Sequence, residues 1–125
     1  EVMTYSKHKK SPDIGVYADV LKVLGNKTRL SMVKILDQTE CCVCYFTELF
    51  AMSQSAISQH MQRLKKFGLI NEEPRRQWIM YTLNIESIYY PFVKSIIDHI
   101  PDDVFDMNEI NSYLEGRLAK EGSVW

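Results

Sequence analysis

The chain has 125 residues, 46% of them hydrophobic and 25% charged, with a formal net charge of −1 at pH 7. These values are typical of one globular domain, and no apolar run approaches the ~20 residues that a membrane span needs. No signal peptide is visible, and three crowded cysteines do not make a disulfide framework, so we expect a reducing, cytoplasmic setting. Positively charged residues are concentrated between Gln54 and Gln77. Local charge, and not the net charge of the chain, determines whether a surface contacts phosphates.

The first hundred residues begin with a polar arm and two helices. Residues 1–12 are basic and lack periodicity, so we expect a flexible arm. Apolar residues then recur at helical spacing in residues 14–24 and again in residues 27–37. Gly25 is placed to end the first of these helices, and Asn26 to cap the second.

The stretch from Phe46 to Ile70 predicts a short helix, a tight connection and a longer helix. Ser53 can cap the longer helix, because its hydroxyl can accept a hydrogen bond from an N–H of the first turn. Gly68 suits the left-handed position just past the end of that helix. One stripe of the longer helix should face a core, since apolar residues recur there at i, i+4 and i+7: Ile57, Met61 and Leu64.

The opposite face of this helix is polar in an unusual way. Amides, hydroxyls and an arginine read donor and acceptor patterns in the major groove, whereas a merely solvated helix usually carries Glu and Lys. We therefore interpret the stretch as a helix-turn-helix with residues 54–66 as recognition helix; a two-helix packing unit is the alternative. The candidate DNA-binding residues on the helix are Gln54, Ser55, Ser58, Gln59, His60 and Arg63. Of these, His60 could contact the DNA backbone or simply pack.

After the recognition helix, the pattern of apolar residues changes from that of a helix to that of extended strands. Residues 69–73 and 78–83 read as extended segments on either side of a turn at residues 74–77, which predicts a β-hairpin. A hairpin in this place is a wing. Arg75 and Arg76 at its tip are expected over phosphates or the minor groove, and a charged tip without a ligand is the alternative.

A wide apolar stripe runs from Ile85 to Ile100. It is wider than a helix capping a small domain needs, so we expect it to pair with its copy in a homodimer, with help from the first helix. Pro91 indicates that regular helix begins only around residues 87–90, and Pro101 should stop it.

A last amphipathic helix follows, capped by Asp106 or Asn108 and carrying Ile110, Tyr113, Leu114 and Leu118. The expected fold is mainly α with a β-hairpin wing, a homodimeric winged helix-turn-helix. We divide the chain into a flexible N-terminal arm (1–12), a DNA-binding and dimerisation domain (13–100) and a C-terminal helical extension (101–125).

Three stretches together resemble the ArsR/SmtB family of metal- and metabolite-responsive repressors. They are LKVLGNKTRLSMVKIL at residues 21–36, SQSAISQHMQRLKKFGLI at residues 53–70 and RRQWIMYTLN at residues 75–84. The resemblance covers roughly residues 16–100. It implies a homodimeric repressor, not an enzyme, that binds palindromic double-stranded operator DNA and leaves it when an inducer binds. A two-fold dimer also predicts half-sites about one helical turn apart, or a small multiple of that.

The arsenic-type branch of this family has a Glu-Leu-Cys-Val-Cys-Asp-Leu motif, which stands here as ECCVCYF at residues 40–46. Cys42 and Cys44 fall on the two motif cysteines, so the resemblance implies an As(III) or Sb(III) inducer bound there. Two departures matter. Some members carry a further cysteine where this chain has Thr47, and Cys41 replaces the motif leucine.

Chemistry supports a thiophilic ion at these cysteines. As(III), Sb(III), Cd(II) and Pb(II) favour thiolates, and a helix N-terminus makes thiolates easier to form. On a regular helix Cys42 and Cys44 would differ by ~200° in direction, so one ion bound to both requires an irregular first turn. Cys41 and Cys44 would share a face, which makes Cys41 the candidate third ligand, with an external thiol as the alternative. We hypothesise that the bound ion is incompatible with the dimer shape that fits two half-sites.

Several alternatives remain open. The cysteines could be small buried hydrophobes, or neighbouring thiols that sense oxidants. Other family members bind Zn(II) between paired C-terminal helices, and Glu86, His99 and Asp102 stand at three of the four spacings, with Ile88 in the slot of the missing histidine. A winged-helix protein-interaction module without DNA binding is the rival from another class.

Overall fold

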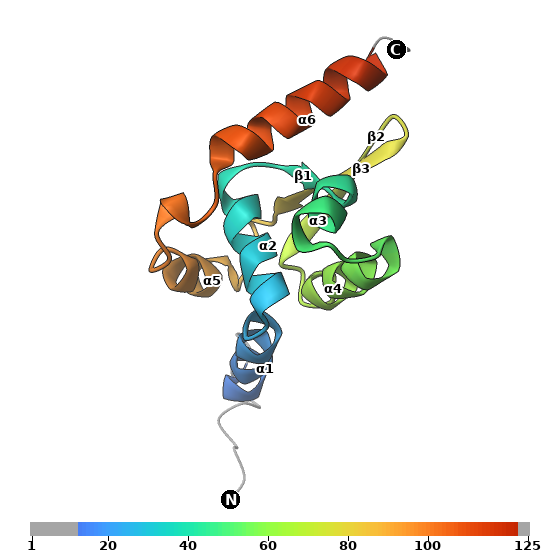
Figure 1. Cartoon of the computed structure of the whole chain (residues 1–125). Coiled ribbons are helices and arrows are strands. Elements are labelled where there is room, and N and C mark those ends of the chain that lie inside the picture. Colours follow the sequence, from blue (N-terminus) through green and yellow to red (C-terminus); the bar gives the residue numbers. More distant parts are fainter. Residues whose placement is uncertain (1–12, 123–125) are drawn as a thin grey trace, which may run out of the picture.

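The computed structural model describes residues 13–122, and it describes side chains up to residue 116. Helices dominate it, with one small sheet (Figure 1). The predicted arm at residues 1–12 and the side chain of Leu118 lie outside the described residues. In chain order the elements are α1 (Ile14–Leu24), α2 (Lys27–Gln38), β1 (Cys41–Cys42), α3 (Val43–Phe50), α4 (Gln54–Lys66), β2 (Ile70–Arg75), β3 (Trp78–Leu83), α5 (Tyr90–Ile97), the 3-10 turn η2 (Asp102–Val104) and α6 (Met107–Gly122).

The helix boundaries in the first half follow the predicted signals. Gly25 ends α1, and the Asn26 side-chain oxygen accepts from the Arg29 N–H at 3.0 Å to cap α2. Ser53 does the same for α4, where its hydroxyl oxygen accepts from the Ala56 N–H at 3.1 Å. Gly68 adopts a φ of +68° just past α4, a left-handed conformation that glycine enters without a Cβ clash.

The core lies between α2, α3, α4 and the sheet. The predicted inner stripe of α4 is confirmed, because Ile57, Met61 and Leu64 are all buried. Phe46 of α3 is also fully buried, so the two helices of the helix-turn-helix are fixed to each other and to α2 by one apolar cluster.

The predicted hairpin is present but its turn is shorter than expected. β2 runs on through Pro74 to Arg75, which pairs with Trp78, so the turn consists of residues 76 and 77. Proline is tolerated there because the sheet order is β1-β3-β2, which makes β2 an edge strand. The two-residue strand β1 was not predicted. It pairs with β3 through Cys41–Tyr81 and Cys42–Met80, and periodicity cannot reveal so short a segment.

The C-terminal part contains a shorter helix than expected. Helix α5 begins at Tyr90 with Pro91 in its first turn, as expected, but ends at Ile97 rather than at Pro101. Ile85 and Ile88 precede it and are exposed. Asp106 caps α6, whose Ile110 and Leu114 are buried in the core, as predicted.

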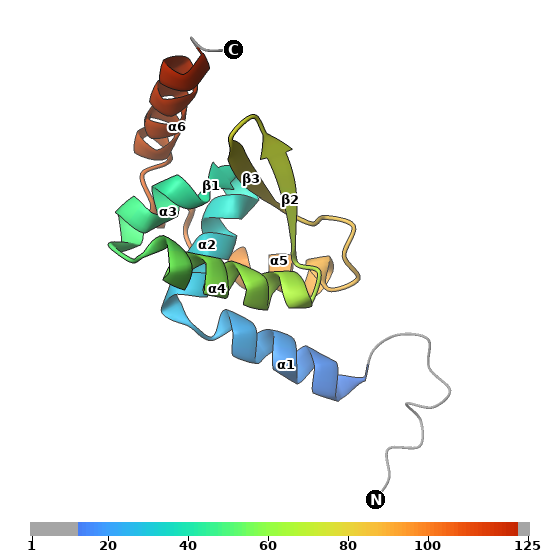
Figure 2. The same ribbon diagram turned by 90° about the vertical axis from the view of Figure 1, so that its right-hand side faces the viewer.

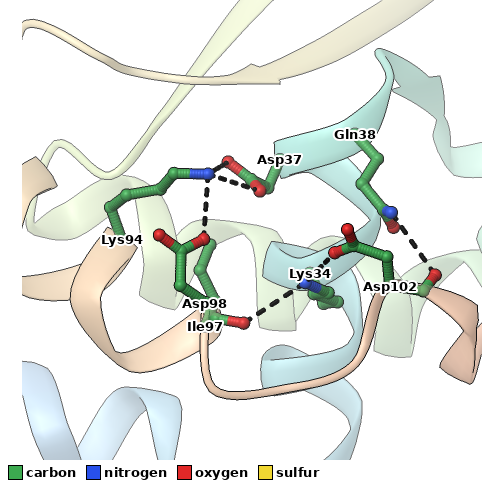
Figure 3. A network of polar contacts seen from close by, with 7 residues as sticks. All are labelled: Lys34, Asp37, Gln38, Lys94, Ile97, Asp98 and Asp102. Carbon is green, nitrogen blue, oxygen red and sulfur yellow. Dashed lines mark hydrogen bonds and ion pairs between the residues drawn. The ribbon is translucent and has the colours of Figure 1, made fainter.

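Figure 3 shows the polar contacts that fasten this C-terminal part to α2. The Lys34 ammonium is 1% exposed; it donates to the Ile97 carbonyl oxygen at 3.3 Å and to Asp102 at 2.8 Å. The Lys94 ammonium donates to Asp37 and pairs with Asp98 at 3.0 Å. These contacts hold the chain where it leaves α5, and so orient α6. Within residues 13–122, no helix combines the length and the hydropathy needed to cross a bilayer.

Candidate nucleic-acid interface and cysteine site

Helix α4 lies along the surface of the molecule, with the wing rising beyond one end (Figure 2). The buried stripe of α4 faces α2, so its polar residues point away from the core. Four of the predicted reading residues are exposed and Ser58 is half-buried; the exposed ones are Gln54, Ser55, Gln59 and Arg63. Arg63, Lys65 and Lys66 place positive charge in the last turn of the helix. This face can present amides, hydroxyls and cations to a groove.

His60 is the predicted reading residue that differs from its neighbours. It is half-buried, and its Nδ1 lies 3.0 Å from Nη1 of Arg29 on α2. Since a guanidinium only donates, this contact requires Nδ1 to accept, in a neutral ring. Burial, and then the charges of Arg29 and Arg63, lower the pKa of His60. The structure thus favours the packing role that the sequence left open, and it adds Arg29 to the residues beside α4.

The two wing arginines occupy different places. Arg75 lies at the end of β2, where its guanidinium donates to both carboxylate oxygens of Glu40 at 2.8 and 2.9 Å. A third contact, to Glu73, measures 3.1 Å. The hydrogen bonds with Glu40 raise the pKa of Arg75. The residue therefore lies beside the wing turn and ties the wing to the segment before β1. Arg76 is exposed in the turn, with a φ of +61°.

Cys42 and Cys44 meet without any unwinding of α3. Cys42 has the extended backbone of an N-cap residue, and the helix begins at Val43, so the helical geometry that would separate the two sulfurs does not apply. The Cα atoms are 5.2 Å apart and the sulfurs are joined in a disulfide. The sequence had predicted thiols in a reducing setting, so this bond is a difference from that expectation. Both sulfur atoms belong to the junction between β1 and α3.

Cys41 does not share a helix face with Cys44, contrary to the expectation. It lies in β1, where successive side chains point to opposite faces, and it is fully buried. Burial raises the pKa of the Cys41 thiol to about 12. Its place and its pKa make it a core residue and a poor third ligand. Among the described side chains, no three or more His, Cys, Asp or Glu residues are grouped to hold an ion.

A cleft of about 700 Å³ opens beside Cys42 and Cys44. Elements from four parts of the chain form its walls. Thr47 and Glu48 come from α3, Gln54 and Ser58 from the reading face of α4, Trp78, Ile79 and Tyr81 from β3, and Tyr113 from α6. Both views of the ribbon place α6 and the wing tip at the same end of the molecule (Figures 1 and 2). Trp78 and Tyr113 were not predicted for this site, because neither lies near the cysteines in the sequence.

The three residues at the spacings of a zinc site make contacts unrelated to metal binding. Asp102 accepts from Lys34, whose hydrogen bond and charge lower the pKa of this carboxyl. Glu86 lies before α5, where its backbone N–H donates to the Asn84 side chain, and His99 is exposed after the helix. Within one chain, the described part of the structure does not gather Glu86, His99 and Asp102 into a ligand group.

A recognition helix packed on a short helix, followed by a two-stranded wing, defines the winged helix-turn-helix class of DNA-binding domains. Residues 26–72 match the family described as bacterial regulatory protein, arsR family. The arsenical resistance operon repressor of Bacillus subtilis is 34% identical over 80 residues, which make up 63% of this chain and 76% of that protein. ArsR1, an arsenic resistance transcriptional regulator of Pseudomonas putida, is 31% identical over 91 residues, covering 72% and 66% of the two chains. This chain belongs to the arsR family of bacterial regulatory proteins.

Solved structures show the same fold. Reduced HlyU from Vibrio cholerae superposes with a TM-score of 0.59 at 31% identity, over 67% of this chain and 83% of that one. The family consists of DNA-binding transcriptional regulators and not of enzymes, and the Bacillus subtilis relative is named a repressor. The expected fold and family are thereby confirmed.

Proposed function

We propose that this chain is a homodimeric transcriptional repressor that binds double-stranded operator DNA and leaves it when As(III) or Sb(III) binds Cys42 and Cys44. One observation carries the proposal: the two sulfurs border the same cleft as Gln54 and Ser58 of the recognition helix. An event at the cysteines therefore occurs in contact with the surface assigned to DNA. Such a regulator acts in the cytoplasm, where its operator is.

The DNA-binding part of the proposal is supported by α4 and the turn of the wing. Gln54, Ser55 and Gln59 are exposed on one face of α4, and Arg63 extends that face with positive charge. Arg76 lies in the wing turn, within reach of a backbone beside the groove that α4 would enter. The proposed contacts from Ser58 and His60 are weaker, because both side chains are half-buried.

The homodimer is supported by apolar residues left exposed in the single chain. Ile14 and Leu21 of α1 are 64% and 49% exposed, and Ile85 and Ile88 before α5 are 68% and 63% exposed. Large apolar side chains gathered on two neighbouring segments of a regulator are best covered by a second copy. A mycobacterial relative of the same fold is described as homodimeric, at 21% identity. A two-fold dimer would place two α4 helices on successive half-sites.

The position of the two cysteines supplies a release mechanism. Cys42 belongs to β1, which pairs with β3 of the wing, whereas Cys44 belongs to α3, which packs on α4. An ion bound through metal–sulfur bonds of about 2.3 Å holds two sulfurs further apart than a direct bond does. Binding would then shift α3 relative to the sheet, and α4 relative to the wing. The ion releases DNA to the extent that it binds this shifted shape more tightly than it binds the shape that fits DNA.

The test is fluorescence anisotropy with a labelled inverted-repeat operator and phosphine-reduced protein. Arsenite, Sb(III), Cd(II), Pb(II) and Zn(II) are titrated against the wild type and Cys42→Ser, and Cys41→Ser is the matched control. We expect As(III) or Sb(III) to release the wild type and Cys41→Ser but not Cys42→Ser. Release of Cys42→Ser by the same ions would exclude this site. Failure of every palindrome to bind at low salt would favour a protein-interaction module instead.

A second candidate function is thiol redox sensing, and the disulfide between Cys42 and Cys44 specifically favours it. A peroxide would take two electrons from the two thiols, whose protons leave in water as the S–S bond forms. The anisotropy measurement separates the two functions. A redox sensor releases DNA with peroxide and no metal, whereas a metal sensor releases it in the phosphine-reduced state when the ion is added.

A further inference from the structure

We propose that the cleft beside Cys42 and Cys44 binds trivalent arsenicals carrying one organic group in preference to inorganic arsenite. The inference rests on the proposed function, because it specifies which arsenic compounds the cysteine pair takes. The two sulfurs hold the arsenic, and the organic group lies in the aromatic part of the cleft.

The number of sulfur ligands is the first argument. Trivalent arsenic forms three bonds, so arsenite needs three thiolates when its oxygens are replaced. Of the three cysteines only Cys42 and Cys44 line the cleft, and Cys41 is fully buried in β1. No three ligating side chains come together among the described residues. An arsenic atom already bonded to carbon needs two thiolates, which is what this cleft supplies.

Thr47 is the second argument. It lies on α3 three residues after Cys44, on the same helix face, and it lines the cleft. A cysteine here would supply the third sulfur. The Thr47 hydroxyl is instead turned to the backbone, where it donates to the Cys44 carbonyl oxygen at 2.8 Å. The position best placed to complete a three-sulfur site therefore holds an oxygen that is already engaged and that soft arsenic binds poorly.

The wall of the cleft is the third argument. Besides the two cysteines and polar residues of α3 and α4, it is lined by Trp78, Tyr81 and Tyr113 together with Val43 and Ile79. Tyr113 is held in place, because its ring packs edge-on against Tyr45 at 5.0 Å and its hydroxyl donates to the Cys44 carbonyl oxygen at 3.5 Å. Aromatic walls favour a methyl or aryl substituent, whose burial stabilises the complex. A volume of about 700 Å³ accommodates a phenyl ring.

The reaction balances without an oxidant. The disulfide is first reduced by a phosphine, which supplies two electrons and becomes a phosphine oxide, while both sulfurs gain protons from water. A compound R–As(OH)₂ then exchanges two As–O bonds for two As–S bonds. Each thiol proton leaves with a hydroxide as water, and arsenic stays trivalent with its As–C bond intact.

The experiment measures Kd by isothermal titration calorimetry on the full chain, reduced with phosphine and then freed of it. Arsenite, methylarsonous acid and phenylarsine oxide are titrated into wild type, Thr47→Cys, Trp78→Leu and Cys42→Ser. In the wild type we expect both organic compounds to bind at least about tenfold more tightly than arsenite, and the phenyl compound about tenfold more tightly than the methyl one. Trp78→Leu should narrow the phenyl-to-methyl ratio. Thr47→Cys should tighten arsenite binding and leave the organic compounds nearly unchanged.

The outcomes separate this inference from the proposed function. Wild-type affinity for arsenite equal to that for the organic compounds overturns the inference and leaves an arsenic-released repressor standing. Tight arsenite binding only with added glutathione also overturns it, because the third ligand is then an external thiol. If no arsenical binds, or Cys42→Ser binds as well as wild type, the proposed function itself fails. Should Thr47→Cys not fold, judged by circular dichroism, the phenyl-to-methyl ratio in Trp78→Leu decides.

Discussion

The surroundings of His60 disfavour the protonated form of its imidazole, and this makes the free energy of unfolding depend on pH. Its pKa lies below the ordinary 6.5 because of burial and the charges of Arg29 and Arg63. In the unfolded chain the imidazole takes up its proton near pH 6.5, before the folded protein does. Between these two pKa values the unfolded state binds more protons, so stability falls as pH falls. Above pH 6.5 both states are neutral and the effect vanishes.

We therefore expect the wild type to lose more thermal stability than His60→Gln when the pH is lowered from 7.5 to 5.5. Glutamine keeps an acceptor for the Arg29 guanidinium but does not titrate. The measurement is the midpoint of thermal unfolding by circular dichroism at the two pH values. The exposed His99 provides the matched control, since His99→Gln should follow the wild type. Equal pH dependence in wild type and His60→Gln would show that His60 is not the group responsible.

At the scale of elements, two glycines in different backbone conformations test how the backbone conformation decides the effect of a substitution. Gly68 has a φ of +68° after α4, and a Cβ there would meet no atom within 4 Å. Any cost of adding a side chain thus comes from the left-handed backbone alone. Gly116 lies inside α6, also with nothing within 4 Å of an added Cβ. There the backbone is helical, and alanine is the better helix former.

The same substitution should then have opposite signs at the two sites. We expect Gly68→Ala to lower the free energy of unfolding by about 1 kcal/mol, because left-handed φ is unfavourable for alanine. Gly116→Ala should raise it by about 0.5–1 kcal/mol. Urea denaturation followed by circular dichroism measures both. A loss at both sites would mean that α6 is not helical at residue 116, and no change at Gly68 would mean that the wing can relax.

At the scale of the whole molecule, the exposed isoleucines before α5 should govern assembly. Ile88→Lys places a charge in the proposed dimer surface, where an unpaired charge is strongly unfavourable. We expect a monomer in sedimentation velocity and at least a tenfold loss of operator affinity, because one α4 then binds one half-site.

Val104→Lys is the matched control, since Val104 is an exposed apolar residue on η2 and does not belong to the proposed dimer surface. It should remain dimeric and bind DNA as the wild type does. The proposed dimer surface is wrong if Ile88→Lys, still folded by circular dichroism, sediments like the wild type. It is equally wrong if Val104→Lys becomes monomeric and Ile88→Lys does not.

The sequence by itself determined the elements whose signals are local. Helix periodicity placed the core stripe of α4, and the capping roles of Asn26, Ser53 and Gly68 were read correctly, because a cap depends on residues within three or four positions. The hairpin also followed from composition, although its turn was expected to be two residues longer. The sequence does not show that β2 is an edge strand, in which Pro74 is tolerated.

Only the tertiary structure decided what depends on distant partners. The strand β1 exists because β3 pairs with it, and this pairing starts α3 at Val43 and lets Cys42 reach Cys44. Arg75 lies beside the wing turn, and its guanidinium is bound there by Glu40, 35 positions away. Trp78 and Tyr113 join the cysteine cleft across long stretches of chain. Contacts between residues far apart in sequence leave no local pattern, so these features of the site could not be read from the sequence.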